Sequence, residues 1–311
     1  MIFVAILLLI AGFVALVKGA DVFVDGAAAL AGKFGIPQLV IGLTIVAMGT
    51  SLPEAAVSIT AGIKGNAGIT VGNIVGSNIL NILIILGVTA LITNVAIQKT
   101  TFKYEIPYML LITAVLLVMG MTGNEITFIE GVILWILFIA YLLYLYILAK
   151  KGNDSGDEQS VKLYPVWKCL FFIVLGGVCV VIGSQFVVNG ATIIARACGM
   201  SERFIGLTIV AFGTSLPELV TSVSAARKGN AGIAIGNIVG SNIFNILFVI
   251  GTVALICPVP FESRFVIDTV VAILCGVLLW GGTIRHKELR KPCGVVMLLC
   301  YAAYFVYLAA M

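Results

Sequence analysis

One hexapeptide, Gly-Thr-Ser-Leu-Pro-Glu, occurs twice in this chain, at residues 49–54 and 213–218, each time inside a long apolar stretch. Around it, residues 41–87 align with residues 205–251 at a constant offset of 164 without a gap, and 33 of the 47 positions are identical. Chance does not produce such a match, so the chain is a duplicated unit whose two copies serve one function. Each copy also places an acidic residue where an ionised group is costly.

The composition is that of a membrane protein. Hydrophobic residues make up 61% of the chain and charged residues 10%, and the mean hydropathy is +1.19. A transmembrane helix needs about 20 apolar residues, and the apolar stretches predict an all-α membrane protein with ten such helices. The predicted helices cover residues 2–31, 36–62, 68–92, 105–121, 126–149, 165–197, 203–226, 232–256, 265–283 and 291–310.

The two copies are expected to be inverted relative to each other. Five helices is an odd number, so the second copy enters the membrane from the opposite side to the first. The expected domains are a first five-helix repeat at 1–149, a hydrophilic linker at 150–163 and a second, inverted five-helix repeat at 164–311. Placing both termini outside puts 13 of the 18 basic residues on the cytoplasmic side, as the positive-inside rule favours.

The remaining composition excludes several classes of function. The net charge of +4 follows from the membrane topology, and no aromatic-basic cluster indicates nucleic-acid binding. The seven cysteines include no Cys-x-x-Cys pair, so we expect neither a disulfide framework nor a zinc site. The linker is too short to fold alone. No cofactor and no obligate protein partner are therefore expected, apart from the lipid bilayer.

Each hexapeptide is expected to interrupt its helix and to expose oxygen atoms there. Pro53 and Pro217 cannot donate the backbone hydrogen bond that the carbonyl four residues earlier would receive. Non-helical backbone is tolerated at membrane depth only where it is buried in protein or lines a polar cavity. Ca²⁺ takes 6–8 oxygen ligands from carboxylates, carbonyls and similar groups. The hexapeptides supply these types, with Glu54 and Glu218 as the carboxylates, and so predict a cation site.

A purely structural alternative is a capping box. Ser51-x-x-Glu54 and Ser215-x-x-Glu218 match the pattern in which a serine and a glutamate satisfy the free amides at a helix start. Such a cap contributes about 1 kcal/mol, whereas an ionised carboxylate at mid-membrane costs of order 3 kcal/mol or more. Two symmetry-related copies therefore favour a cation site, with which a partial capping role is compatible.

A second repeated motif, Gly-Asn-Ile-Val-Gly-Ser-Asn-Ile-x-Asn, follows at residues 72–81 and 236–245. Asn73, Ser77 and Asn81 are spaced four residues apart, so they share one face of a helix. The alternative is helix–helix packing, in which glycines permit close approach and asparagines bond across the interface. Beside the glutamate segments, we expect these faces to complete the same cavity. Its neutral oxygens would come from Ser77, Asn81, Ser241 and Asn245.

Together these motifs resemble those of the sodium/calcium exchanger family of cation/Ca²⁺ antiporters, and specifically its short prokaryotic members. The resemblance covers the second, third, seventh and eighth predicted helices. It implies a central Ca²⁺ site flanked by paired glutamates, Na⁺ sites around it, and a bacterial or archaeal cell (inner) membrane as the location. The implied side-chain ligands are Thr50, Ser51, Glu54, Ser77 and Asn81, with Thr214, Ser215, Glu218, Ser241 and Asn245. The implied carbonyl ligands are those of Ala47 and Ala211, one turn before each break.

The charge of the expected site is set by two glutamates. Some members of the family, including its potassium-dependent branch, carry an aspartate where this chain has Asn245. With Asn81 and Asn245 both neutral, only Glu54 and Glu218 are charged, and one Ca²⁺ or two Na⁺ would neutralise them. Competition for the same carboxylates is the physical basis of exchange, and we expect it to be independent of K⁺.

Other charged residues are weaker candidates for ligands. Lys18, Asp21 and Asp25 lie on one face of the first predicted helix, but the matching positions in the second half are uncharged. We therefore expect a local salt bridge near the cytoplasmic end of that helix. His286, the only histidine, lies in a basic loop and has no expected role in proton transfer.

The function that these observations favour is Na⁺/Ca²⁺ antiport by alternating access, in which the first and sixth helices move against the core. A Ca²⁺/H⁺ antiporter is the alternative, since a buried glutamate can carry a proton, although the Thr-Ser pair beside each glutamate favours Na⁺. A passive channel fits paired occluding glutamates less well. A membrane protease with a carboxylate pair would use aspartates and would not need the duplicated hydroxyl residues, so we do not expect an enzyme.

Overall fold

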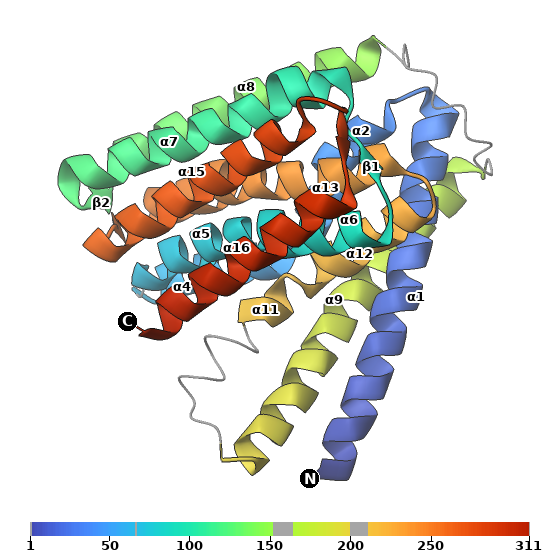
Figure 1. Ribbon diagram of the computed structural model, residues 1–311, viewed down its shortest axis with the longest axis horizontal. Helices are drawn as coiled ribbons and strands as arrows, with labels where there is room; N and C mark the ends of the chain where they lie inside the picture. The colour runs from blue at the N-terminus through green and yellow to red at the C-terminus, as the bar shows by residue number, and fades with distance from the viewer. Residues whose placement is uncertain (1, 66, 152–163, 200–210, 311) are drawn as a thin grey trace.

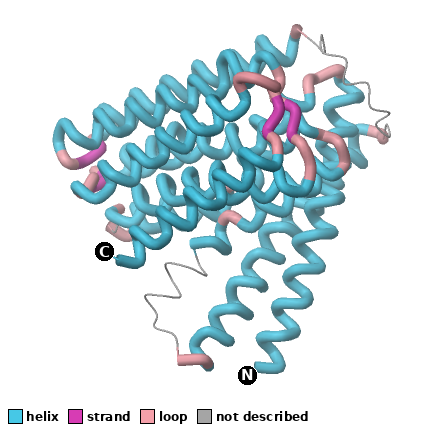
Figure 2. The backbone as a smooth tube through the Cα atoms, viewed as in Figure 1, coloured by secondary structure: helices cyan, strands magenta, loops and turns pink. Residues whose placement is uncertain are grey.

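The computed structural model describes residues 2–65, 67–151, 164–199 and 211–310, and nearly all of them are helical (Figure 1, Figure 2). The elements of the first half are α1 (Ile2–Phe34), α2 (Gln38–Ile41), η1 (Gly42–Val46), α3 (Ala47–Thr50), α4 (Leu52–Ile63), α5 (Gly68–Leu80), η2 (Asn81–Leu86), α6 (Gly87–Ile92), β1 (Val95–Ala96), η3 (Thr101–Glu105), α7 (Ile106–Gly123), β2 (Glu125–Ile126) and α8 (Phe128–Lys150). Those of the second half are α9 (Val166–Ala197), α11 (Ala211–Thr214), α12 (Leu216–Arg227), α13 (Ala231–Phe244), η5 (Asn245–Ile250), α14 (Gly251–Ile256), β3 (Val259–Pro260), α15 (Ser263–Thr283), β4 (Glu288–Leu289) and α16 (Lys291–Ala310).

The membrane spans agree with those predicted from the apolar stretches. Among the described residues, eight helices are long and apolar enough to cross a membrane, and the bent pair Gln38–Thr50 and Leu52–Ile63 makes a ninth span if it is counted as one. The predicted span 203–226 begins outside the described residues, and its described part is α11 and α12. The predicted linker at 150–163 also lies outside them, apart from its first two residues. The all-α membrane class is thus confirmed.

Two short strand pairings were not predicted. β1 pairs antiparallel with β4, and β2 pairs antiparallel with β3. Each strand has two residues and lies in a loop between apolar spans, so it leaves no alternating pattern in the sequence. The start of β3 lies 164 residues after that of β1, so the pairings relate matching loops and link the two halves of the chain.

The longest helices, α1 and α9, pack against each other along a line of glycines. Gly12, Gly19 and Gly26 recur every seven residues on α1, as do Gly176, Gly183 and Gly190 on α9. A Cβ atom at Gly183 would lie 2.8 Å from the carbonyl oxygen of Gly12, and one at Gly176 would lie 2.7 Å from that of Gly19. Glycines late in α1 lie beside residues early in α9, and the reverse, so the two helices are antiparallel. Figure 1 shows this pair projecting from the rest of the bundle.

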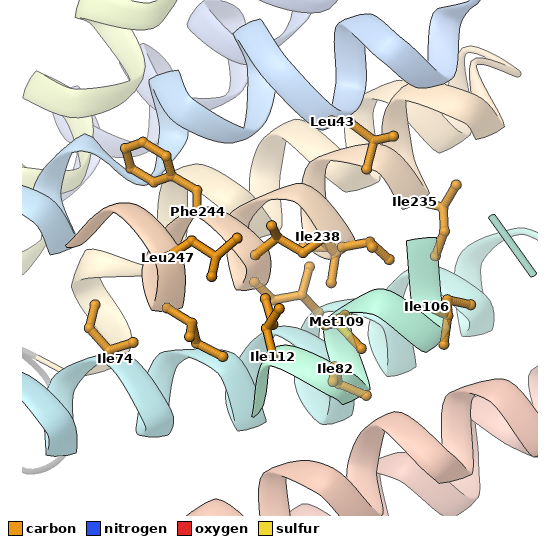
Figure 3. Packing of buried hydrophobic residues seen from close by; sticks show 14 of the residues in the cluster. Leu43, Ile74, Ile82, Ile106, Met109, Ile112, Ile235, Ile238, Phe244 and Leu247 are labelled. Atoms are coloured by element: carbon orange, nitrogen blue, oxygen red, sulfur yellow. The ribbon is translucent and has the colours of Figure 1, made fainter. Parts of the chain in front are cut away.

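The core lies around α5–η2 and α13–η5, with α7 packed beside them. Ile74, Ile238 and Met109 are almost completely buried there, and Figure 3 shows Ile238 close to Met109 and Ile74 farther along the same cluster. Close packing on the second half depends on small residues: a Cβ atom at Gly236 would lie 2.8 Å from the carbonyl oxygen of Leu39. Gly236 therefore serves helix packing, as one interpretation of the second motif held. In the first copy a Cβ atom at Gly72 would meet the ring of Phe265 at 3.2 Å, and one at Gly76 would have no described atom within 4 Å, so Gly76 does not make the expected close approach.

Candidate ion-binding site

Both hexapeptides break their helices, as their prolines predicted. Helix α3 ends at Thr50, Ser51 has φ −82° and ψ 7°, and α4 begins at Leu52 with the chain direction bent by 51°. Pro53 is the second residue of α4, where its missing N–H costs no intrahelical hydrogen bond. Ser215 separates α11 from α12 in the same way, with φ −91° and ψ 4°. Each break places a glutamate in the first turn of the following helix.

The two glutamates are buried and are bound by serines of the opposite half. Glu54 and Glu218 are each 1% exposed. The Ser51 hydroxyl donates to Glu218 Oε1 at 2.8 Å, and the Ser215 hydroxyl donates to Glu54 Oε1 at 3.1 Å. The side chain of neither serine caps its own helix. The capping-box interpretation is therefore wrong, because each serine uses its hydroxyl on a carboxylate 161 or 167 residues away.

The threonines of the hexapeptides join the same network. The side chains of Thr50 and Thr214 interact with the carboxylates of Glu218 and Glu54 respectively. The Thr50 hydroxyl also lies 3.3 Å from the carbonyl oxygen of Ala47, which the Ser241 hydroxyl approaches to 3.3 Å. The structure thus brings predicted ligands from both repeats into one buried cluster.

Asn81 and Asn245 lie where α5 and α13 change to π-helical turns, which are often found at functional sites. Their amide nitrogens cross to the opposite half. Asn81 Nδ2 donates to Asn242 Oδ1 at 2.9 Å, and Asn245 Nδ2 donates to Asn78 Oδ1 at 3.1 Å. Asn78 and Asn242 belong to the repeated motif but were not among the predicted ligands. Their recurrence at the 164-residue offset is the feature that could have identified them.

Four buried oxygens at this centre have no hydrogen-bond partner in the described part of the chain. They are Glu54 Oε2, Glu218 Oε2, Asn81 Oδ1 and Asn245 Oδ1. The elements that carry them are adjacent, since α4 packs against η5 and α12 packs against η2. A buried polar atom without a partner is unusual and requires an explanation. Two carboxylate and two amide oxygens are the ligand types that Na⁺ and Ca²⁺ take.

Two other predicted ligands, Ser77 and Ala211, lie on α5 and α11, and Asn73 of the same helical face has a different role. Ser77 is 5% exposed on α5, one turn before Asn81. Ala211 is the first residue of α11, at the edge of the described residues. Asn73, which the helical face had grouped with the site, donates instead to Ser58 Oγ at 2.9 Å and toward the carbonyl of Glu54 at 3.4 Å. It therefore holds α5 against α4.

The local salt bridge predicted within α1 is wrong, because Asp21 and Asp25 pair with a lysine of the other half. Lys228 Nζ lies 2.7 Å from Asp25 Oδ1 and 3.7 Å from Asp21 Oδ1, and Ser224 Oγ donates to Asp21 Oδ1 at 2.6 Å. Lys18, the partner expected from helical spacing, makes neither of these contacts. The reason is tertiary: α1 packs against α12, whose end carries Lys228.

Comparison with known proteins gives a consistent result. The family model described as sodium/calcium exchanger protein matches residues 4–147 and 168–310. The sodium/calcium exchanger MaX1 of Methanosarcina acetivorans is 36% identical over 99% of both chains. The inner membrane protein YrbG of Escherichia coli is 35% identical over 93% of this chain and 92% of its own.

Solved structures of the sodium-calcium exchanger NCX_Mj have the same fold. The form soaked with 10 mM Na⁺ and zero Ca²⁺ matches with a TM-score of 0.85 and 34% identity, over 98% of this chain and 99% of that chain. The form soaked with zero Na⁺ and Ca²⁺ matches with a TM-score of 0.86 and 33% identity.

Proposed function

The chain belongs to the sodium/calcium exchanger protein family, and from this we propose that it exchanges Na⁺ for Ca²⁺ across a membrane. The family consists of transport proteins rather than enzymes. The observation that carries the proposal is the buried pair Glu54 and Glu218, each with one oxygen bound by the opposite repeat and one without a partner among the described residues. Such a pair suits a desolvated cation far better than it suits any structural role.

We assign the ligands of the transported ions to the residues that the two motifs predicted. The carboxylates of Glu54 and Glu218 provide two negative charges, and the oxygens of Asn81 and Asn245 provide neutral coordination. Hydroxyls of the hexapeptides, from Thr50, Ser51, Thr214 and Ser215, complete the set together with neighbouring groups: the carbonyls of Ala47 and Ala211 and the hydroxyls of Ser77 and Ser241. One Ca²⁺ or two Na⁺ neutralise the two charges, so the ions compete and are exchanged rather than carried together.

The proposed architecture is ten helices in two inverted repeats, 1–149 and 164–311, joined by a cytoplasmic linker, with both termini outside. Two observations support it. The antiparallel packing of α1 on α9 is what inverted copies of one helix would give. The reciprocal bonds Ser51–Glu218 and Ser215–Glu54 are what a pseudo-twofold axis in the membrane plane would give. The location that fits is a prokaryotic cell membrane, as for YrbG.

Transport is proposed to proceed by alternating access, with the α1–α9 pair moving against the core that holds the site. The pair packs mainly on itself, and much of its length is exposed. Its movement would have to break or remake the hydrogen bond from Ser184 Oγ to the carbonyl oxygen of Gly213 (2.6 Å) and the ion pair between Lys228 and Asp25. The loaded site crosses because its charge is neutralised, whereas a site with two bare carboxylates does not.

Uptake of radiolabelled Ca²⁺ into proteoliposomes, under separately imposed Na⁺, H⁺ and K⁺ gradients, tests the proposal. An outward Na⁺ gradient should drive uptake, and dissipating it should stop uptake. Uptake that follows a proton gradient and ignores Na⁺ would show the alternative, Ca²⁺/H⁺ antiport.

A further inference from the structure

We propose that Asn78 and Asn242 are positioning residues for the transported cation. Each turns an asparagine of the opposite repeat, Asn245 or Asn81, so that its carbonyl oxygen and not its amide nitrogen faces the ion. This inference rests on the proposed function, because it takes Asn81 and Asn245 as ligands. It also explains how the neutral amides at positions 81 and 245 can present an oxygen, and not a nitrogen, to the cation.

An asparagine amide has two ends of similar size and opposite character. The oxygen accepts hydrogen bonds and can bind a cation, whereas the NH₂ group only donates and repels one. A half-turn about the last side-chain bond exchanges the two ends. A ligand asparagine therefore needs a neighbour whose own polarity is fixed, and a chain of hydrogen bonds that starts at a backbone group provides this.

The chain of bonds starts at two backbone carbonyls, which can only accept. Asn78 Nδ2 donates to the carbonyl oxygen of Asn242 at 3.2 Å, and Asn242 Nδ2 donates to the carbonyl oxygen of Asn78 at 3.2 Å. Each of these amides is thereby fixed with its nitrogen toward the opposite backbone. The second side of the Asn242 amide nitrogen faces Met109 Sδ at 3.7 Å, a weak acceptor, and Figure 3 shows Met109 in this part of the core.

The orientation of the outer pair follows from that of the inner pair. Once their nitrogens are fixed, Asn78 Oδ1 and Asn242 Oδ1 can only accept. Their contacts at 3.1 Å and 2.9 Å must therefore come from the NH₂ groups of Asn245 and Asn81. The oxygens of Asn81 and Asn245 are then left at the other end of each amide.

The freed oxygens are the ones that have no partner. Asn81 and Asn245 are each 1% exposed, and Oδ1 of each is buried and unpaired within the described part of the chain. Asn78 is 4% exposed and Asn242 is 1% exposed, so water does not compete for the bonds that orient them. Groups that orient metal ligands in this way typically change metal affinity about 10–100-fold when they are removed.

A double-mutant cycle tests the inference in the full chain reconstituted in proteoliposomes, with KM and kcat for Na⁺-driven Ca²⁺ uptake as the readout. Asn78→Leu removes the acceptor that orients Asn245. We expect it to raise KM for Ca²⁺ about tenfold. In a chain that already carries Asn245→Asp, the same change should raise KM less than about twofold, because a carboxylate presents an oxygen in either orientation.

Asn242→Leu is the matched control for this cycle. It acts on Asn81, so Asn245→Asp should not rescue it, and its effect should be about tenfold in both backgrounds. A second cycle, Asn242→Leu with Asn81→Asp, should show the rescue from the other side. Asn94→Leu, at an exposed loop position, should leave KM unchanged. Where a leucine variant does not stay monodisperse in detergent, the serine variant replaces it in the same cycle.

The outcomes separate this inference from the proposed function. One outcome is that Asn78→Leu raises KM equally in the wild-type chain and in the chain that carries Asn245→Asp. That result would mean that Asn78 only supports packing, and the inference would be wrong. No Na⁺-driven uptake by the wild-type chain in the same vesicles would instead overturn the proposed function. Wild-type exchange with specific rescue supports both.

Discussion

At the scale of residues, the site is defined by groups that use one atom for the fold and leave another free. Glu54 and Glu218 each accept a serine hydrogen bond on Oε1, and Oε2 of each has no partner in the part of the chain that the structure describes. Asn81 and Asn245 donate a hydrogen bond with the amide nitrogen, and the amide oxygen of each has no partner among the described residues. The same division in four residues, related in pairs by the repeat, is difficult to explain by packing alone.

Glu54→Gln and Glu218→Gln should each abolish Ca²⁺ exchange while the protein remains in the membrane. A glutamine keeps the size and one oxygen but removes one of the two charges, so a divalent ion is left half-neutralised. Initial rates of Ca²⁺ uptake in proteoliposomes, at matched protein content, measure the effect. Glu125→Gln, at an exposed position of β2, is the control and should exchange normally. Near-normal exchange by either site variant would show that the carboxylates are not shared ligands.

Exchange should also fall in acid, because protons and cations compete for the same carboxylate oxygens. Binding a proton removes one of the two negative charges that the ions need, so lower pH reduces the fraction of carriers able to load. The measurement is the Ca²⁺ uptake rate across buffers of decreasing pH, with the Na⁺ gradient held constant. A rate that stays flat from neutral pH into the acid range would contradict protonatable glutamates as ligands.

At the scale of elements, the important feature is which helices can approach to backbone contact. A Cβ atom at Gly176 on α9 would lie 2.5 Å from the backbone nitrogen of Phe23 on α1, a distance that real Cβ atoms do not reach. Its neighbour Gly177 would meet only a ring carbon of Phe23, at 3.9 Å. The two glycines are adjacent in sequence but occupy different environments.

Gly176→Ala should therefore destabilise the protein, whereas Gly177→Ala should not. Overpacking a close helix contact costs about 1–3 kcal/mol, while alanine in an uncrowded helix position is favoured over glycine by about 0.5–1 kcal/mol. Thermal unfolding of the detergent-purified variants should give a lower midpoint for Gly176→Ala and an equal or higher one for Gly177→Ala. Identical midpoints would mean that α1 and α9 are not held in this contact.

At the scale of the whole molecule, the site belongs to neither half alone. Serine–glutamate and asparagine–asparagine bonds cross between the repeats, and the β1–β4 and β2–β3 pairings join their loops. The Asp25–Lys228 ion pair adds a further link between α1 and α12. The formal charge of the complete site is set by two glutamates, because both central asparagines are neutral.

Exchange should thus be independent of K⁺. An additional K⁺ needs a further negative charge, which an aspartate at position 245 would provide and Asn245 does not. The test is Na⁺-driven Ca²⁺ flux with K⁺ replaced by choline on both sides and the membrane potential clamped. Equal flux is expected. An absolute requirement for K⁺ would show that neutral Asn81 and Asn245 suffice for a potassium site and that charge counting fails.

The membrane class, most of the spans, the duplication and the helix breaks at Pro53 and Pro217 could all be predicted from the amino-acid sequence. These features follow from local properties: the length of apolar stretches, and the inability of proline to donate a hydrogen bond. The sequence also identified Glu54 and Glu218, because a carboxylate in an apolar stretch needs a reason to be there.

Which polar groups contact one another became clear from the folded structure alone. Ser51 could have capped its own helix, and Asn73 could have faced the cavity, but Ser51 binds Glu218 and Asn73 holds two helices together. The partner of Asp25 proved to be Lys228 rather than Lys18 for the same reason. These contacts join residues that are mostly more than 160 positions apart, so no local pattern encodes them. They arise because two copies of one unit face each other across the site, and each copy satisfies the polar groups of the other.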